Sequence, residues 1–239
     1  MHKNLEVIGQ ILEFIRHRRY EQGDRLLSER DFSAKFGVTR QYIREAIATL
    51  EAVRVVERRS NSGIYLRDVD AEGSIDAMVL QVETGGVLKR SEVADSMELR
   101  RILEVQAVRL ACERSDNDDL EFLADNLEET KKKIDAGESI AVEDRQFHQR
   151  IIASTRNKAL VRVVNSFYEL SRQRRDIYFS DMERCQASYE QHIEIFEAIK
   201  RRRVGQASKC MENHLTRTVA AWEILLSTQR SDQIEDDSE

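Results

Sequence analysis

The sequence predicts a mainly α-helical protein in which a small amino-terminal domain precedes a larger antiparallel helical bundle. Three observations predict this fold class. The 239 residues contain no proline, which favours helices over a turn-rich β architecture. Apolar residues recur at helical spacing along most of the chain, and no long strand pattern is present. Charged residues make up 34% and hydrophobic residues 41% of the chain, as in a globular protein.

Charge divides the chain into two parts. The first 68 residues hold 13 Lys/Arg against 10 Asp/Glu, whereas the rest hold 25 against 34. A mildly basic segment before an acidic one is typical of a small nucleic-acid-binding head on a larger domain. Three cysteines without CxxC spacing argue against a disulfide framework and predict a cytoplasmic location. We expect no signal peptide and no membrane span, because charges interrupt every apolar run.

The head begins with three predicted helices. Apolar spacing predicts a helix over residues 5–19. Ser28, with Asp31 three residues later, can cap a second helix that ends at Gly37. Thr39 can cap a third helix that runs to about residue 52. Two short helices joined at a glycine indicate a helix-turn-helix.

The third helix and the segment after it carry residues suited to DNA. Arg40, Gln41 and Arg44 face outward near the start of the helix, where arginine can bind guanine and glutamine adenine through paired hydrogen bonds. Next, "VRVVERR" and "IYLR" flank "SNSG", which predicts a β-hairpin wing whose Arg58 and Arg59 meet phosphate or the minor groove. The spacing alone is equally consistent with a DNA-binding head and with a small helical bundle whose arginines only face solvent.

The segment "LLSERDFSAKFGVTRQYIREAIATLE" resembles the winged helix of GntR-type bacterial transcription regulators. The resemblance implies that Arg30, Arg40, Arg44 and the wing tip contact DNA. The departures from the family pattern are Leu27 for a proline, Arg54 for a glycine and Asn61 for a wing glycine. Asparagine tolerates positive φ, so the wing turn can form, whereas Arg54 predicts a locally different turn. The predicted DNA-contacting residues are Arg30, Thr39, Arg40, Gln41, Arg44, Arg58, Arg59, Asn61 and Gly63.

The remaining chain reads as a linker and a helical bundle. The expected organisation is a head over residues 1–68, a linker with a short helix over 69–90, a helical domain over 91–228 and a disordered acidic tail over 229–239. Helices are predicted at 91–114, 116–136, 139–155, 157–180, 186–203 and 206–228. Ser91, Ser115 and Asn157 are the expected caps. Short connections between these helices predict antiparallel packing.

Three histidines and one aspartate lie on apolar faces of separate predicted helices. Asp144 and His148 stand one turn apart, and His192 and His214 lie on later helices. A single histidine on such a face is usually a satisfied core residue. Bundle interiors, however, build metal sites from inward side chains on several helices, and three imidazoles with a carboxylate suit zinc, nickel, manganese or iron. The residues alone leave both interpretations open, because convergence in space is assumed.

The helical domain also resembles a known family. The segments "ELRRILEVQAVRLA", "DRQFHQRI", "YEQHIEIFEAI" and "MENHL" are similar to the FCD ligand-binding domain of the FadR subfamily of GntR regulators. Metal-binding members use an aspartate and three histidines at these motif positions, which implies ligand roles for Asp144, His148, His192 and His214. Family members that bind acyl-CoA lack this set.

Arg100 falls on the inward stripe of its helix with Leu103 and Ala107. An inward arginine offers a fixed fork for a carboxylate, and the alternative is an internal salt bridge. The resemblance implies that an arginine here holds the carboxylate of the effector. Arg174 and Arg175 are weaker candidates and are interpreted as surface charges.

These observations predict a homodimeric transcription repressor that reads a palindromic operator in double-stranded DNA. A small organic acid bound at a metal site would release the repressor from DNA. Zinc is the expected metal, and nickel, manganese or iron are the alternatives. One alternative is a regulator whose metal is purely structural. The other is a metal-dependent hydrolase, but no HExxH motif, nucleophile elbow or phosphate-binding glycine loop is present.

Overall fold

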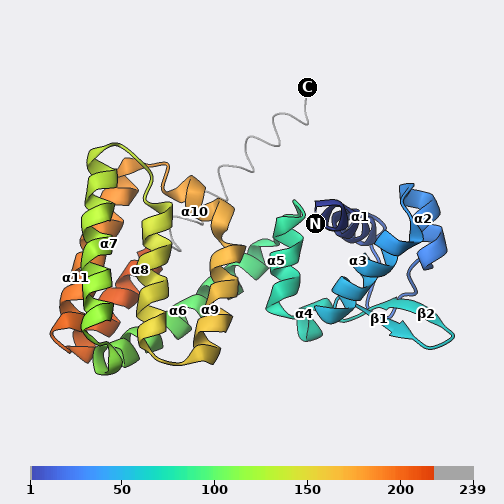
Figure 1. The fold of residues 1–239 in the computed structure, drawn as a ribbon. Coiled ribbons are helices and arrows are strands. Elements are labelled where there is room, and N and C mark those ends of the chain that lie inside the picture. Colours follow the sequence, from blue (N-terminus) through green and yellow to red (C-terminus); the bar gives the residue numbers. More distant parts are fainter. Residues whose placement is uncertain (1, 218–239) are drawn as a thin grey trace. The chain divides into compact units, whose positions relative to one another are not determined.

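A computed structural model describes residues 2–217 of the chain and confirms the mainly α-helical fold class (Figure 1). The chain divides into two compact units, one ending at Lys89 and the other beginning at Arg90. No helix within the described residues is long and apolar enough to cross a membrane.

The first unit is a winged helix-turn-helix. It contains α1 (His2–His17), α2 (Glu29–Phe36), α3 (Arg40–Ala52), β1 (Val56–Arg59) and β2 (Gly63–Leu66). The strands pair antiparallel, with Val56 opposite Leu66 and Arg59 opposite Gly63. As predicted, the side chain of Ser28 accepts a hydrogen bond from the backbone N–H of Asp31 and caps α2. Gly37 ends α2 with φ 66°, a conformation that glycine adopts without strain.

The helices of this unit pack around one apolar core. Ile11 of α1, Phe32 of α2 and Leu50 of α3 are each fully buried. Ile64 of β2 joins the same core, so the wing is attached to the helix-turn-helix by packing. Burial of side chains of this size stabilises the fold by roughly 1.5–3 kcal/mol each.

Two turns of this unit hold non-glycine residues at positive φ. Asn61 adopts φ 54° at the tip of the wing, which confirms the prediction that asparagine supports this turn. Arg54, after α3, adopts φ 63°. Arginine therefore accepts the left-handed region that glycine favours, at a cost of about 1 kcal/mol.

Residues 69–90, expected to form a linker, contain α4 (Val69–Glu72) and α5 (Ile75–Glu83). Ala77 and Leu80 of α5 are buried in the core of the first unit. The apolar patch "IDAMVL" thus forms the predicted short helix, and that helix packs on the head because its apolar side chains need a core.

The second unit is a bundle of helices (Figure 1). Its elements are α6 (Arg90–Arg114), α7 (Asn117–Asp135), α8 (Ala141–Ser154), α9 (Lys158–Leu170), α10 (Arg172–Tyr178) and α11 (Met182–Lys200), followed by helical residues 204–217. Helix α8 packs against α6, α7 and α9, and α11 packs against α6 and α7. Phe147, Ile151, Ile195 and Met211 are buried where these helices meet.

Several helix boundaries differ from the predicted ones, and the expected cap Ser91 lies inside α6, which begins at Arg90. The helix predicted over 157–180 is interrupted at Ser171, whose hydroxyl accepts a hydrogen bond from the Arg175 guanidinium. Asp116, rather than Ser115, caps α7 through a capping box with Asp119. Helix α11 begins at residue 182 because Asp181 caps it. Asn157 caps α9 as predicted. The predicted acidic tail, residues 229–239, lies outside the described residues.

Candidate functional site

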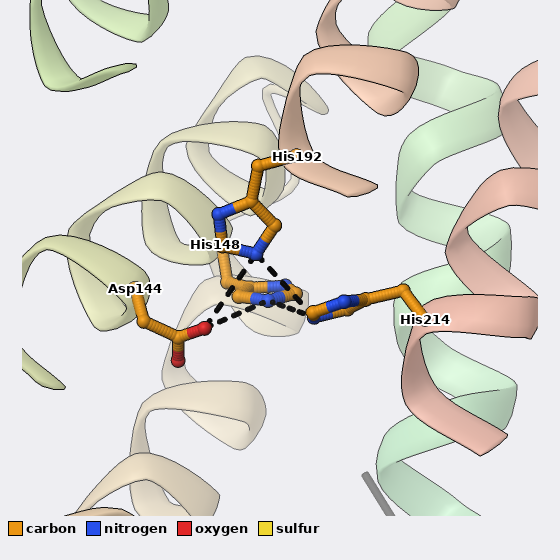
Figure 2. Close-up of side chains that lie close together, drawn as sticks. All are labelled: Asp144, His148, His192 and His214. Atoms are coloured by element: carbon orange, nitrogen blue, oxygen red, sulfur yellow. Dashed lines mark hydrogen bonds and ion pairs between the residues drawn. The ribbon is translucent and has the colours of Figure 1, made fainter. Parts of the chain in front are cut away.

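Four buried side chains converge inside the helical bundle. Asp144 and His148 project from α8, His192 comes from α11, and His214 comes from the helical residues 204–217. Figure 2 shows these side chains pointing toward one another. One ligand atom from each lies within 4.8 Å of the others, and the residues are between 0% and 5% exposed. We call these four residues the Asp–His cluster.

The imidazoles present the same atom to the centre. His148 Nε2 lies 3.1 Å from His214 Nε2, which is 3.4 Å from His192 Nε2. Asp144 Oδ1 lies 3.8 Å from His148 Nε2 and 3.5 Å from His192 Nε2. Donor atoms held about 2.0–2.1 Å from one tetrahedral zinc ion lie about 3.3 Å apart. The observed spacings fit such a donor set.

Hydrogen bonds to Nδ1 fix the orientation of the His148 and His214 rings. His148 Nδ1 lies 2.5 Å from Glu104 Oε2, and His214 Nδ1 lies 2.7 Å from Gln191 Oε1. Both partner oxygens are acceptors, so each Nδ1 carries a proton, and Nε2 is the ring nitrogen left for a metal. The two Nε2 atoms face each other at 3.1 Å, an arrangement that suits a shared cation.

The protonation of the rings also fits a metal. Burial and the neighbouring imidazoles lower the pKa of His192 well below its usual value. Burial and the imidazole of His148 do the same to the pKa of His214. Both rings are neutral near pH 7, and neutral imidazole is the form that binds metals. His192 Nδ1 has no hydrogen-bond partner among the described residues, and its ring stacks on Phe147 with centroids 4.1 Å apart.

A cavity adjoins the Asp–His cluster and carries three arginines. Asp144 and His214 line it together with Arg100, Arg174 and Arg175. Its other lining residues are Met97, Ser171, Tyr178 and Phe179. We call this space the arginine-lined cavity. A small anion in it would meet guanidinium groups on one side and the cluster on the other.

Arg100 makes the internal salt bridge that was the alternative interpretation, and it also lines the cavity. It lines the cavity and is 8% exposed, while its Nε donates to Glu104 Oε1 at 2.6 Å. Its Nη2 donates to the Tyr168 hydroxyl at 3.3 Å. Burial lowers the pKa of Arg100, but the nearby Glu104 carboxylate and its other partners outweigh burial and raise it. Arg100 is thus an internal salt-bridge partner that also faces the cavity.

The interpretation of Arg175 as a surface charge was wrong. Arg175 is 8% exposed, and its guanidinium donates to the carbonyls of Ala141 and Tyr168 at 3.1 and 3.2 Å. Arg174 is partly buried, and burial lowers the pKa of both arginines. Ser171 separates α9 from α10, and helical spacing did not predict this break.

Sequence reasoning missed several residues around the cluster. Glu104 and Tyr168 accept hydrogen bonds from Arg100, Gln191 binds His214, and Ser188 donates to Asp144 Oδ1 at 3.4 Å. Glu104 could have been found, since it lies one turn after Arg100 on the same helix face. The other three have no distinctive spacing relative to the residues that they contact.

In the first unit, the predicted DNA-contacting residues at the start of α3 are exposed. Thr39 caps α3 without using its hydroxyl, and Arg40 and Gln41 lie in the first turn. The side chain of Arg44 is 65% exposed and lies 3.3 Å from Glu29. Arg30 is exposed at the start of α2, with 81% of its side chain accessible.

Arg58 is committed to contacts within the protein. Its Nη1 donates to Glu51 Oε2 at 2.7 Å, and its Nη2 reaches the carbonyl of Arg44 at 3.2 Å and Glu29 at 3.4 Å. Arg58 therefore ties β1 to α3 and to the start of α2.

Wing-tip residues line a groove beside α2. Arg59, Asn61 and Gly63 line it with Arg25, which sequence reasoning missed. Arg59 binds Glu57 at 2.6 Å and lies over the ring of Tyr65. A Cβ on Gly63 would lie 2.8 Å from Arg25 Nε, so the absence of a side chain lets Arg25 cross the wing.

A winged helix-turn-helix head followed by a helical domain with a buried cluster and cavity is the organisation of a DNA-binding transcription regulator. Comparison with known families agrees. Residues 3–66 match the bacterial regulatory proteins of the gntR family, and residues 95–217 match the FCD domain. The chain therefore belongs to the GntR family and carries an FCD domain.

Curated relatives extend over most of the chain. It is 28% identical over 207 residues to the HTH-type transcriptional regulator LutR of Bacillus subtilis, covering 84% of this chain and 93% of LutR. It is 28% identical over 236 residues to the HTH-type transcriptional repressor NanR of Edwardsiella tarda, covering 95% and 88%. These relatives are regulators, so the expectation of a regulator over a hydrolase is confirmed.

Solved structures share the fold. Lar, described as controlling the agr system of Listeria monocytogenes, matches with a TM-score of 0.62 and 21% identity, over 92% of this chain and 96% of Lar. McbR/YncC of E. coli matches with a TM-score of 0.56 and 17% identity, over 94% of each chain.

Proposed function

We propose that this protein is a homodimeric repressor whose release from DNA is triggered by a small organic acid bound beside a metal in the FCD domain. The observation that carries the proposal is the convergence of Asp144 and the Nε2 atoms of three histidines, with His148 Nε2 and His214 Nε2 3.1 Å apart, next to the arginine-lined cavity. A cation shared by those nitrogens would lie beside the arginines, which favour a carboxylate as the next ligand.

The Asp–His cluster would hold a divalent transition metal. Three imidazoles and one carboxylate suit zinc best, and nickel, manganese or iron are also compatible. When bound, the metal supplies a Lewis acid that attracts a carboxylate oxygen. Ser188 orients Asp144 by donating to Oδ1, and Glu104 and Gln191 orient two of the imidazoles.

The arginines would recognise the acid. Arg100, Arg174 and Arg175 line the same cavity as Asp144 and His214, so a carboxylate there would meet guanidinium cations. Guanidinium groups bind carboxylates through parallel hydrogen bonds. Because Arg100 and Arg175 are already hydrogen-bonded to the protein, their positions are set before the acid arrives.

The head would read a palindromic operator as a dimer. Arg40, Gln41 and Arg44 lie on the exposed start of α3, the part of a recognition helix that reaches base edges. Arg30, Thr39 and the wing-tip residues Arg59, Asn61 and Gly63 would position the head on the phosphates. Arg58, predicted as a DNA contact, would act by holding the wing against α3.

Repression and release need two states of different DNA affinity. An acid can shift the equilibrium only by as much as it binds one state better than the other. The name of the NanR relative supports repression, and the FCD domain supports response to a small molecule.

A second candidate is a metal that only stabilises the bundle. The near-complete burial of the Asp–His cluster favours it, with His148 0% and His192 1% exposed. One experiment separates the two. Small carboxylic acids are titrated into zinc-loaded and chelated protein, and heat release on binding is measured by calorimetry. Binding to the zinc-loaded protein alone supports the sensory site, and equal binding to both forms supports the structural one.

A further inference from the structure

A single buried carboxylate joins the Asp–His cluster to the arginine-lined cavity. Glu104 of α6 is 1% exposed. Its Oε1 accepts hydrogen bonds from Arg100 Nε at 2.6 Å and from the Tyr168 hydroxyl at 2.7 Å, and its Oε2 lies 2.5 Å from His148 Nδ1. Burying a carboxylate is costly unless it is paired and hydrogen-bonded, and here three donors satisfy both oxygens.

The contacts of Glu104 fix the direction of these bonds. Arg100 Nε and the Tyr168 hydroxyl both donate to Oε1, and a carboxylate paired with a guanidinium accepts hydrogen bonds. His148 Nδ1 is therefore a protonated nitrogen that donates to Oε2, and Nε2 is the ring nitrogen left to face the cluster.

The other oxygen of Glu104 sets the orientation of Arg100. Within the described residues, Arg100 donates through Nε to Glu104 and through Nη2 to Tyr168, and its guanidinium lines the cavity. A bond to Nε fixes the plane of the guanidinium, because the fork is rigid. Glu104 thus determines which edge of Arg100 an acid meets.

The three histidines of the cluster differ in the hydrogen-bond partner of Nδ1. His148 has an anionic partner in Glu104, His214 has the neutral amide of Gln191, and His192 Nδ1 has no partner among the described residues. An anionic partner raises the basicity of an imidazole ligand most. Among the three, His148 is the ligand whose strength depends most on its partner.

We propose that Glu104 is a positioning residue that orients His148 toward the metal and Arg100 toward the acid, so that one carboxylate sets both binding events. This inference rests on the proposed metal and acid site. Loss of such an outer carboxylate typically weakens metal binding by about 10- to 100-fold.

The test compares two matched variants of the full-length protein. Glu104→Gln removes the charge of the positioning residue, and Glu113→Gln makes the same change at an exposed site on the same helix, α6. Zinc affinity is measured by competition with a chromophoric chelator. We expect Glu104→Gln to bind zinc about 10- to 100-fold more weakly, and Glu113→Gln to remain within about twofold of the wild type because surface changes perturb little. Equal affinities of the two variants would overturn the proposal.

Two further measurements separate positioning from a loss of folding. Cobalt(II) is loaded in place of zinc, and its visible absorption should change shape in Glu104→Gln but not in Glu113→Gln, because the spectrum reports ligand geometry. In the metal-free wild type, long-range ¹H–¹⁵N spectra should show His148 protonated at Nδ1. A proton on Nε2 instead contradicts the proposal even if Glu104→Gln fails to fold.

The outcomes also separate this inference from the function on which it rests. Wild-type protein that binds neither zinc nor cobalt refutes the metal site itself. Wild-type protein that binds one metal, with Glu104→Gln unchanged in affinity and spectrum, refutes only the role of Glu104.

Discussion

Replacing His192 with alanine should remove the stabilisation that metal binding gives to the fold. A ligand that binds only the native state stabilises it by about 2.7 kcal/mol when present at about 100 times its Kd. For a domain of this size, 1 kcal/mol corresponds to about 2–4 °C in Tm, so zinc should raise the Tm of the wild type by about 5–11 °C. His192 supplies one of the four converging donors, so zinc should leave the Tm of the variant nearly unchanged.

His192→Ala should also lower the stability of the metal-free protein. The stacked contact between His192 and Phe147, with centroids 4.1 Å apart, contributes about 0.5–1.5 kcal/mol. This loss lowers the Tm of metal-free protein and must be measured separately.

The assay is thermal unfolding followed by circular dichroism, with and without zinc, for the wild type, His192→Ala and His17→Ala. His17 is exposed on α1 of the first unit, so His17→Ala controls for the loss of an imidazole. A zinc-dependent rise in His192→Ala equal to that of the wild type would refute the ligand role of His192.

Three further predictions concern DNA and effector binding. Arg44→Ala should cost about 1–3 kcal/mol of specific operator binding, and unchanged affinity in a gel-shift titration would remove Arg44 from the interface. Arg58→Ala should weaken operator binding without changing the slope of log K against log salt, because Arg58 contacts Glu51 and Glu29 instead of phosphate; a slope reduced by about one ion would make it a phosphate contact. Arg100→Gln should abolish release by the small carboxylic acid that releases the wild type while leaving DNA binding intact, and retained release would place the carboxylate anchor elsewhere.

Periodicity was enough to predict most of the helices and the inward position of the cluster residues, whereas their convergence was implied by the family resemblance. Asp144 and His148 stand one turn apart on an inward face, and the structure places both in the bundle interior. The helix-turn-helix could be predicted because Ser28 and Gly37 mark the ends of α2 by local chemistry that operates within a few residues.

Features that depend on tertiary contacts could not be predicted. The break at Ser171 is stabilised by the Arg175 guanidinium, and that break buries an arginine which periodicity placed on the surface. Arg58 was predicted to contact DNA because of its charge and its place in the wing. Its partners in the structure are Glu51 on α3 and Glu29 on α2, which local spacing does not link to Arg58. Likewise, the bond between Glu104 and His148 joins residues 44 positions apart, which no local pattern encodes.

The central claim is that a metal held by the Asp–His cluster is needed for an acid to release the protein from DNA. Its most direct test is the fluorescence anisotropy of a labelled operator, selected from random DNA by the protein itself, during titration with a panel of small carboxylic acids. The account predicts that an acid releases the zinc-loaded protein at a concentration at least about tenfold lower than it releases the chelated protein, the lower end of the coupling typical between linked sites. Identical release curves for the two forms would contradict it.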